Sequence, residues 1–344
     1  MKEFGSNFQS IDSYDSHRAH LTDVFKGALL LADGRQCIIV LIKQFGWKRL
    51  WMPEYFSKKV VKSIIDQTGI AINYYEDNPF KEAKVNSLPY QDGDVLLRMN
   101  YFGMRELRKN KNIPVPVIED HSHDPFGHWA LYSDADWCIS SIRKTLPLPE
   151  GGMMWSPKGH KLEVDLMNTD ENQIVASQRW KGMEEKANYL DGMDISKRDY
   201  REIFLETEEW FENAAPSLID ERSKTFIEKQ LDINLWLGAK RKNWYILKDL
   251  IRSSKCSVLE AEHESCTMFS LVLLFNDKSI RNSVRQELIQ KDVYPAVLWD
   301  ITEEASEDAK SFSSRMLSIH CDGRYSEQEI RMLARIINEV LDNY

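Results

Sequence analysis

Short apolar runs with the composition of β-strands alternate with helical segments through the first half of the chain. Residues 71–75, 95–101 and 137–141 are strand-like, and residues 115–118 form a compact β-branched run. Lys58–Thr68 instead has apolar residues at positions 60, 61, 64 and 65, which is a helical spacing. Strands that alternate with helices predict an α/β fold of three layers, in which helices cover both faces of a mostly parallel sheet.

The segments that flank these strands complete the expected pattern. Residues 28–31 and 37–45 are apolar and compatible with helix, whereas residues 171–189, 197–214 and 223–251 are long, charged and helical. Shorter elements follow: strands over 268–275, 294–301 and 315–320, and helices over 279–291 and 326–341. We therefore predict a large domain over residues 1–250, which includes a helical linker over about 171–250, and a small C-terminal α+β domain over 251–344.

Composition excludes several classes of protein. The 344 residues carry a net charge of −9, which does not suit a nucleic-acid binder because phosphate contacts need a basic face. Residues 27–42 are the longest apolar stretch, and the polar residues 33–36 interrupt it, so no transmembrane span is predicted. The first six residues lack the apolar core of a signal peptide. Five cysteines without a CxxC pair indicate free thiols in a reducing compartment, and we expect a cytoplasmic protein.

The densest group of reactive side chains follows the β-branched run and spans residues 119–124, Glu-Asp-His-Ser-His-Asp. Ligands of an open parallel sheet bind at the carboxyl ends of its strands, and Asp120 is expected at such an end. A metal-dependent hydrolase built on Asp120, His121 and His123 is one alternative, and an ordinary polar loop is another. No second cluster with ligand spacing accompanies this group, so we predict no metal site.

Two further signals lie on either side of it. Lys144 comes just after the strand-like residues 137–141 and follows the hydroxyl of Ser141; a lysine there can form a Schiff base if its surroundings lower its pKa. Gly34 precedes an apolar helical run, and a glycine turn at a helix N-terminus suits a phosphate. Asp33 as an ordinary helix N-cap explains that turn equally well.

Together these signals resemble the fold-type I enzymes that use pyridoxal 5′-phosphate (PLP), and within them a short, divergent branch of the DegT/DnrJ-type sugar aminotransferases. The resemblance covers nearly the whole chain. It is carried, in order, by seven motifs: residues 33–36, 51–57, 69–75, 100–103, 119–123, 140–144 with the glycine pair 151–152, and 317–320 with 324–326.

The resemblance implies roles for individual residues. Lys144 would bind PLP covalently and move the substrate proton, and Asp120 would pair with the pyridine nitrogen. His123 would hydrogen-bond near the phenolic oxygen of the ring or stack on it. The remaining positions would bind the cofactor or approach the substrate: Phe56 or Tyr55 stacks on the ring, Gly34, Arg35, Gln36 and Ser141 hold the phosphate, and Asn100 lies at the ring edge or the substrate.

The chain also departs from the family pattern. Asp33, Arg35 and Gln36 replace the small residues of the phosphate turn, and Asp120 lies only 24 positions before Lys144. The resemblance implies a homodimeric aminotransferase that moves an amino group from an amino acid to a keto sugar, possibly nucleotide-linked, in polysaccharide or cell-envelope biosynthesis. Its partners are small molecules, with no nucleic acid and no membrane. Other PLP chemistry, such as a lyase or dehydratase reaction, and a non-catalytic protein of the same fold are the alternatives.

Overall fold

The computed structural model describes residues 2–11 and 21–344, and its centre is a seven-stranded sheet. In spatial order its strands are β2 (Leu29–Leu31), β8 (Gly152–Trp155), β7 (Trp137–Ser140), β6 (Val117–Asp120), β5 (Asp94–Met99), β3 (Arg49–Pro53) and β4 (Ala71–Tyr75). Only β8 runs against its neighbours within this sheet, so six strands share one direction. The predicted α/β fold with a mostly parallel sheet is confirmed.

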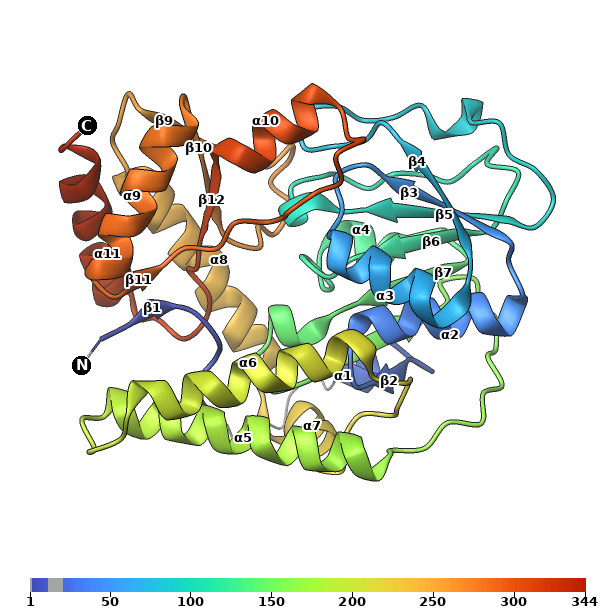
Figure 1. Cartoon of the computed structure of the whole chain (residues 1–344), viewed down its shortest axis with the longest axis horizontal. Helices are drawn as coiled ribbons and strands as arrows, with labels where there is room; N and C mark the ends of the chain where they lie inside the picture. Colours follow the sequence, from blue (N-terminus) through green and yellow to red (C-terminus); the bar gives the residue numbers. More distant parts are fainter. Residues whose placement is uncertain (1, 12–20) are drawn as a thin grey trace.

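Successive side chains along a strand point to opposite faces of the sheet, and both faces are buried here. Leu97, Ile118 and Ile139 pack into one apolar core with α2 (Gly34–Phe45) and α3 (Lys58–Thr68). Their neighbours along the strands point into a second core with α5 (Asp170–Leu190) and α6 (Lys197–Asn213). In Figure 1, α5 and α6 lie side by side as a long hairpin beneath the sheet, and α6 also contacts α3.

A smaller antiparallel sheet forms the other lobe, with strands in the order β12 (Met316–Ile319), β10 (Leu271–Phe275) and β9 (Cys256–Val258). Its helices are α8 (Ile233–Leu250), α9 (Lys278–Gln290), α10 (Glu307–Arg315) and α11 (Glu327–Leu341). The strand β1 (Phe4–Gly5) pairs with β11 (Val293–Tyr294), so the described N-terminal residues lie against the C-terminal part of the chain (Figure 1). The division into domains at about residue 250 stays a prediction.

The remaining helices are short: α1 (Leu21–Val24), α4 (His128–Tyr132) and α7 (Glu221–Thr225), with 3₁₀ turns at Val85–Ser87, Tyr101–Gly103 and Ile142–Lys144 and a π turn at Phe226–Gln230. No helix among the described residues is long and apolar enough to cross a membrane. The five cysteines are free, and four of them are buried.

Three local predictions were wrong. Residues 28–31 are not helical, because Leu29–Leu31 pairs with β8 as a strand too short to show a period. Residues 223–251 do not form one helix, because the π turn ends at Leu231 and Asp232 begins α8 by accepting the backbone N–H of Leu235. The strand expected over 294–301 is limited to Val293–Tyr294.

Candidate active site

The carboxyl ends of β6 and β7 meet in one cavity. Asp120 is the last residue of β6, and one of its carboxylate oxygens accepts the backbone N–H of Ser122 at 2.8 Å. The hydroxyl of Ser122 in turn accepts the backbone N–H of Ser141, just past β7, at 2.8 Å. The second oxygen of Asp120 has no hydrogen-bond partner among the described residues and is free to accept a donor in the cavity. Adjacent parallel strands therefore place a free carboxylate oxygen beside the turn that carries Lys144.

Lys144 ends the 3₁₀ turn after β7 and lines this cavity. Its ammonium has no ion-pair or hydrogen-bond partner in the described part of the chain, and it lies 5.7 Å from the centre of the Trp299 ring. Burial lowers the pKa of Lys144, Asp120 opposes that change, and Arg143 adds to it. A partly desolvated lysine without an ion-pair partner is more readily deprotonated, and so more nucleophilic, than a surface lysine.

Glycines let the α2 turn approach these strand ends. A Cβ atom on Gly34 would lie 2.7 Å from the Cβ of Ser141, and one on Gly152 would lie 2.3 Å from the carbonyl oxygen of Asp33. The backbone N–H of Gly151 donates to the carbonyl of Ala32 at 2.7 Å. Gly152, the second glycine of the pair that follows the lysine turn, is thus required by the close approach of β8 to the turn at the start of α2, whereas a Cβ atom on Gly151 would lie 2.8 Å from a side-chain carbon of Ile142.

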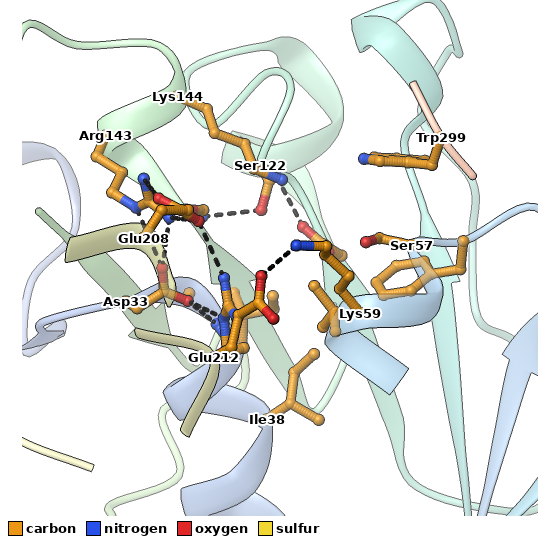
Figure 2. Close-up of a pocket in the computed structure, with 17 residues that line it drawn as sticks. Asp33, Ile38, Ser57, Lys59, Ser122, Arg143, Lys144, Glu208, Glu212 and Trp299 are labelled. Atoms are coloured by element: carbon orange, nitrogen blue, oxygen red, sulfur yellow. Dashed lines mark hydrogen bonds and ion pairs between the residues drawn. The ribbon is translucent and has the colours of Figure 1, made fainter. Parts of the chain in front are cut away.

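An ion-pair network fills the end of the cavity at the N-terminus of α2 (Figure 2). Asp33 caps the helix and bonds to Arg35 Nε at 2.9 Å and to Arg143 Nη2 at 2.9 Å. Glu208 of α6 accepts from both terminal nitrogens of Arg143 at 2.9 Å and lies 3.3 Å from Arg35 Nη2. Arg35 Nη1 is buried and unpaired. The network therefore retains one free donor for an anion.

The two carboxylates of this network are held ionised by the arginines. Burial would raise the pKa of Asp33, but Arg35 and Arg143 lower it well below its ordinary value. Burial also opposes ionisation of Glu208, and Arg143 and Arg179 lower its pKa to about 2. Both groups are negative at neutral pH, so the arginines are partly neutralised before any ligand binds.

Two residues on the other side of the cavity were not identified from the sequence. Lys59 of α3 reaches Glu212 of α6 in an ion pair, and the indole of Trp299 forms part of the opposite wall (Figure 2). Neither Trp299 nor Glu208 belongs to a local motif, because each is brought in by long-range packing. Ser122 could have been noted, since it follows Asp120 by two residues in a loop at a strand end.

His123 lies next to this cavity in a stack of rings. Its Nδ1 accepts the backbone N–H of Phe102 at 2.9 Å, so the proton of the neutral ring is on Nε2, which is buried and unpaired. The imidazole stacks with Phe269 at 4.6 Å and with Trp299 at 5.2 Å between ring centres. Burial, followed by the charges of Lys144 and Lys240, lowers its pKa well below the ordinary value. His123 is thus a neutral donor at physiological pH.

The structure brings some of the predicted residues together and leaves others apart. The first cavity has a volume of about 200 Å³, and its lining includes six of them: Gly34, Arg35, Phe56, Asp120, Ser141 and Lys144. Tyr55 is fully buried, with its hydroxyl on the carbonyl of Leu298. Gln36 bonds to the backbone of Ala215 and Ser217, and Asn100 accepts the backbone N–H of Arg105. Tyr55, Gln36 and Asn100 do not line this cavity.

A separate polar cluster lies on the opposite face of the sheet. The ligand atoms of Glu119, His121 and Cys138 are within 4.8 Å of one another, and all three residues are buried. Glu119 already accepts from Asn110 at 2.7 Å and from Ser133 at 2.6 Å, and His121 lies 3.2 Å away. The group has the contacts of a hydrogen-bonded structural cluster.

Comparison with known proteins identifies the fold. No protein-family profile matches the chain, and no curated protein sequence matches it significantly. One similar solved structure is Helicobacter pylori PseC, an aminotransferase involved in the biosynthesis of pseudoaminic acid. Its TM-score is 0.66 at 11% identity, and the match covers 100% of this chain and 100% of that chain. The putative sugar aminotransferase Spr1654 of Streptococcus pneumoniae, in its PMP form, has a TM-score of 0.61 at 10% identity, over 92% of this chain and 88% of that one.

A third match is 3-amino-5-hydroxybenzoic acid synthase, with a TM-score of 0.60 at 14% identity over 92% of this chain and 87% of that chain. At such identities the likeness establishes the fold. The chain has the fold of the DegT/DnrJ-type aminotransferases, over nearly its whole length, and the predicted structural resemblance is confirmed.

Proposed function

We propose that this chain, which has the fold of the sugar aminotransferases, is a PLP-dependent aminotransferase. The observation that carries the proposal is the arrangement at the ends of β6 and β7. There, an unpaired lysine with a lowered pKa and a carboxylate with one unpaired oxygen line the same cavity. Fold-level likeness alone would not support an activity, because unrelated functions share folds.

The residues present fit the cofactor. Asp120 offers an unpaired oxygen for a protonated ring nitrogen, and His123 offers an unpaired Nε2–H close to Lys144. Arg35 Nη1, the hydroxyl of Ser141 and the N-terminus of α2 offer donors for the phosphate. Phe56 and Trp299 supply apolar surface at the ring. When bound, PLP supplies an electron sink that stabilises negative charge at the substrate Cα.

Each residue then has a defined task. Lys144 Nζ would hold the cofactor covalently, and its lowered pKa suits it to accept the proton of the substrate Cα. The unpaired oxygen of Asp120 would accept a hydrogen bond from the ring nitrogen. His123 stays neutral and donates through Nε2.

The substrate part of the proposal depends on the solved relatives. The pneumococcal protein is described as a putative sugar aminotransferase, and the Helicobacter pylori protein is an aminotransferase involved in the biosynthesis of pseudoaminic acid. By analogy we propose a keto sugar as amino acceptor, an amino acid as donor and a homodimer as the active assembly. The cytoplasmic localisation stays a prediction.

One observation favours a second candidate, a non-catalytic protein of the same fold. The carboxylate of Asp33 accepts the backbone N–H of Arg35 at the N-terminus of α2, which is a donor that a phosphate would otherwise use. The two candidates differ in a simple test. An aminotransferase retains PLP through Lys144 and loses the absorbance of the lysine-bound cofactor when an amino donor is added.

The experiment uses the purified protein incubated with PLP. We expect the yellow absorbance band of lysine-bound PLP, its loss on borohydride reduction, and its conversion by glutamate or another amino acid. Lys144→Ala should abolish the band, whereas Lys62→Ala, which alters an exposed lysine paired with Asp66 on α3, should retain it. A protein without the band refutes the proposal, and a band that survives Lys144→Ala refutes the role of Lys144.

A further inference from the structure

A second cavity adjoins the lysine turn. Its volume is about 250 Å³, and Lys144 lines both this cavity and the first one. Among the described residues of its wall are three cationic side chains and four polar residues without a fixed charge, Ser6, Asn7, His123 and His320. The wall therefore offers uncharged hydrogen-bonding groups in addition to its cations.

The N-terminal segment, which we define as residues 2–8, contributes to this wall and is held by both lobes. Its strand β1 pairs with β11 next to the small lobe. The carbonyl of Asn7 accepts from Lys186 Nζ of α5 at 2.7 Å and from Arg324 Nη1 at 3.1 Å. Glu3 forms an ion pair with Lys186 at 2.7 Å. The backbone of the segment is therefore fixed where it borders the cavity.

Three of these polar side chains lack a partner inside the protein. The hydroxyl of Ser6, the amide of Asn7 and the ring nitrogens of His320 make no hydrogen bond to another described residue. Nδ1 of His320 lies 3.9 Å from a carboxylate oxygen of Asp322, which is beyond hydrogen-bond distance. Arg324 instead binds both oxygens of that carboxylate at 2.9 Å. Polar groups that no internal partner satisfies are available to a ligand in the cavity.

His320 is positioned by the N-terminal segment. A Cβ atom on Gly5 would lie 3.1 Å from Cδ2 of His320, so the absence of a side chain there lets the segment pass close to the ring. Phe269 lies edge-on to the same ring, at 6.4 Å between ring centres. Burial and the charge of Arg324 lower the pKa of His320 to about 4, and Asp322 opposes this change. The imidazole is therefore neutral at physiological pH, with one donor nitrogen and one acceptor nitrogen.

Aromatic surface in the same cavity suits the ring of a sugar. Phe8, Phe204 and Phe269 all line it. A pyranose has C–H groups on its faces, which pack against aromatic side chains, and hydroxyl groups around its edge, which need polar partners. Neutral imidazole and amide groups both donate and accept hydrogen bonds, as a hydroxyl does. An engineered cavity of about 150 Å³ holds benzene, so a cavity of about 250 Å³ has room for a six-membered ring with substituents.

We propose that His320 and the side chain of Asn7 are specificity-determining residues, which hydrogen-bond hydroxyl groups of the acceptor sugar in the second cavity. The proposal rests on the proposed aminotransferase function and deepens it, because it assigns the residues that recognise a sugar beside Lys144. Neither residue takes part in proton transfer. A site built to hydrogen-bond hydroxyl groups discriminates against a ligand that lacks them, because the polar groups of the protein then lose water without gaining a partner.

The test compares two ligands on the PLP-loaded protein by ligand-observed NMR titration. Methyl β-D-xylopyranoside and 2-methoxytetrahydropyran share a ring and a methoxy group, and only the first carries hydroxyl groups on the ring. We expect the xyloside to bind about tenfold more tightly or better. An apolar cavity that does not recognise hydroxyl groups would show the reverse order, because the second ligand is the more hydrophobic.

Variants assign the preference to residues. His320→Phe keeps a ring without donor or acceptor, and Asn7→Ala removes the amide; each should weaken xyloside binding about three- to tenfold and leave the other ligand unchanged. His320→Gln, which retains a donor and an acceptor, should keep most of the preference. His128→Phe and Asn282→Ala, at exposed positions that line neither cavity, are the matched controls. Circular dichroism checks the fold of each variant.

The opposing results are distinct. Equal binding of the two ligands to the unaltered protein, tighter binding of 2-methoxytetrahydropyran, or no binding of the xyloside overturns the proposal. A preference for the xyloside that survives in both His320→Phe and Asn7→Ala also overturns it. If His320→Phe does not fold, the unaltered protein and Asn7→Ala, which changes an exposed side chain, still decide the outcome. Xyloside binding does not require turnover, so its failure is separate from a failure to form the lysine-bound cofactor, which would refute the aminotransferase function itself.

Discussion

The substitution Glu208→Gln tests whether the carboxylate of α6 competes with a phosphate for the arginines of the first cavity. Glu208 lies 2.9 Å from two nitrogens of Arg143 and 3.3 Å from one of Arg35, so it occupies donors that a phosphate would use. Glutamine keeps the shape and removes the charge. If Glu208 competes, the anion affinity of the cavity rises; if it only positions the arginines, the affinity falls.

The magnitude follows from Coulomb's law. The side chain of Glu208 is 39% exposed, so an effective dielectric constant between those of water and protein applies. For an anion at an assumed separation of about 5.5 Å, removing one charge at a dielectric constant of about 40 changes the free energy of binding by roughly 1.5 kcal/mol for each unit of anion charge. That corresponds to a gain in affinity of about tenfold for a monoanion and more for a dianion.

The same substitution should lower the stability of the protein. The pKa of Glu208 is lowered in the folded state from 4.5 to about 2. Its ionised form therefore stabilises the fold above pH 4.5, and this contribution is lost as the pH falls toward 2. The shift corresponds to at most about 3 kcal/mol, and solvent screening at a partly exposed side chain reduces it to about 1–2 kcal/mol. Glutamine should remove this contribution and lower the free energy of unfolding at pH 7.

The assay is titration calorimetry with inorganic phosphate, repeated with PLP by absorbance, and urea unfolding at pH 7. Glu206→Gln, an exposed position on the same helix, is the matched control, and it should alter neither quantity. Tighter phosphate binding with a lower urea midpoint supports the competition. Weaker phosphate binding in Glu208→Gln than in the control would refute it and assign Glu208 a supporting role.

Three further predictions concern other parts of the site. Gly34→Ala should lower the free energy of unfolding by about 1–3 kcal/mol, because its Cβ would lie 2.7 Å from that of Ser141. Urea titration measures this change. In the control Gly238→Ala on α8, where no atom lies within 4 Å of the added Cβ, the free energy of unfolding should not fall. Asp120→Asn should retain the lysine-bound cofactor but slow the glutamate half-reaction by about 10²–10⁴-fold in stopped-flow absorbance; an unchanged rate would contradict the pairing of Asp120 with the ring nitrogen. Burial raises the pKa of Glu150 to about 7, so its contribution to stability is fully present below pH 4.5 and is lost as the pH rises through 7. The urea midpoint of the unaltered protein should therefore fall between pH 5 and pH 8. The midpoint of Glu150→Gln should fall less over the same range.

The parts of the site that could be expected from the sequence lie at strand ends. Asp120 and Lys144 follow strand-like runs, and the parallel arrangement of β6 and β7 brings such ends to one edge. Gly34 precedes an apolar helix, and its turn meets the same edge because the helix follows β2 directly. These residues lie together in the structure, and their catalytic roles stay predictions until Lys144 and Asp120 are tested.

Other parts depend on contacts that no local pattern contains. Residues 55 and 56 are both aromatic, and only packing against the small lobe places Phe56 in the cavity and Tyr55 in the core. Gln36 is adjacent to Arg35, yet it turns to the backbone near residue 215. Trp299 and Glu208 come from distant segments. Spacing along the chain cannot show which of two adjacent residues enters the cavity. Adjacent side chains point in different directions, and tertiary packing decides which of them faces the cavity.

The sequence by itself determined the layered α/β fold and the order of the reactive segments, since hydrophobic periodicity and turn residues act over a few positions. Only the tertiary structure decided the charge of the cavity that Lys144 lines. Asp33 of the α2 turn and Glu208 of α6 neutralise Arg35 and Arg143 beside it, although the three segments are far apart in the sequence. Coulomb interactions depend on distance in space, so the balance of charge around Lys144 exists only in the folded chain.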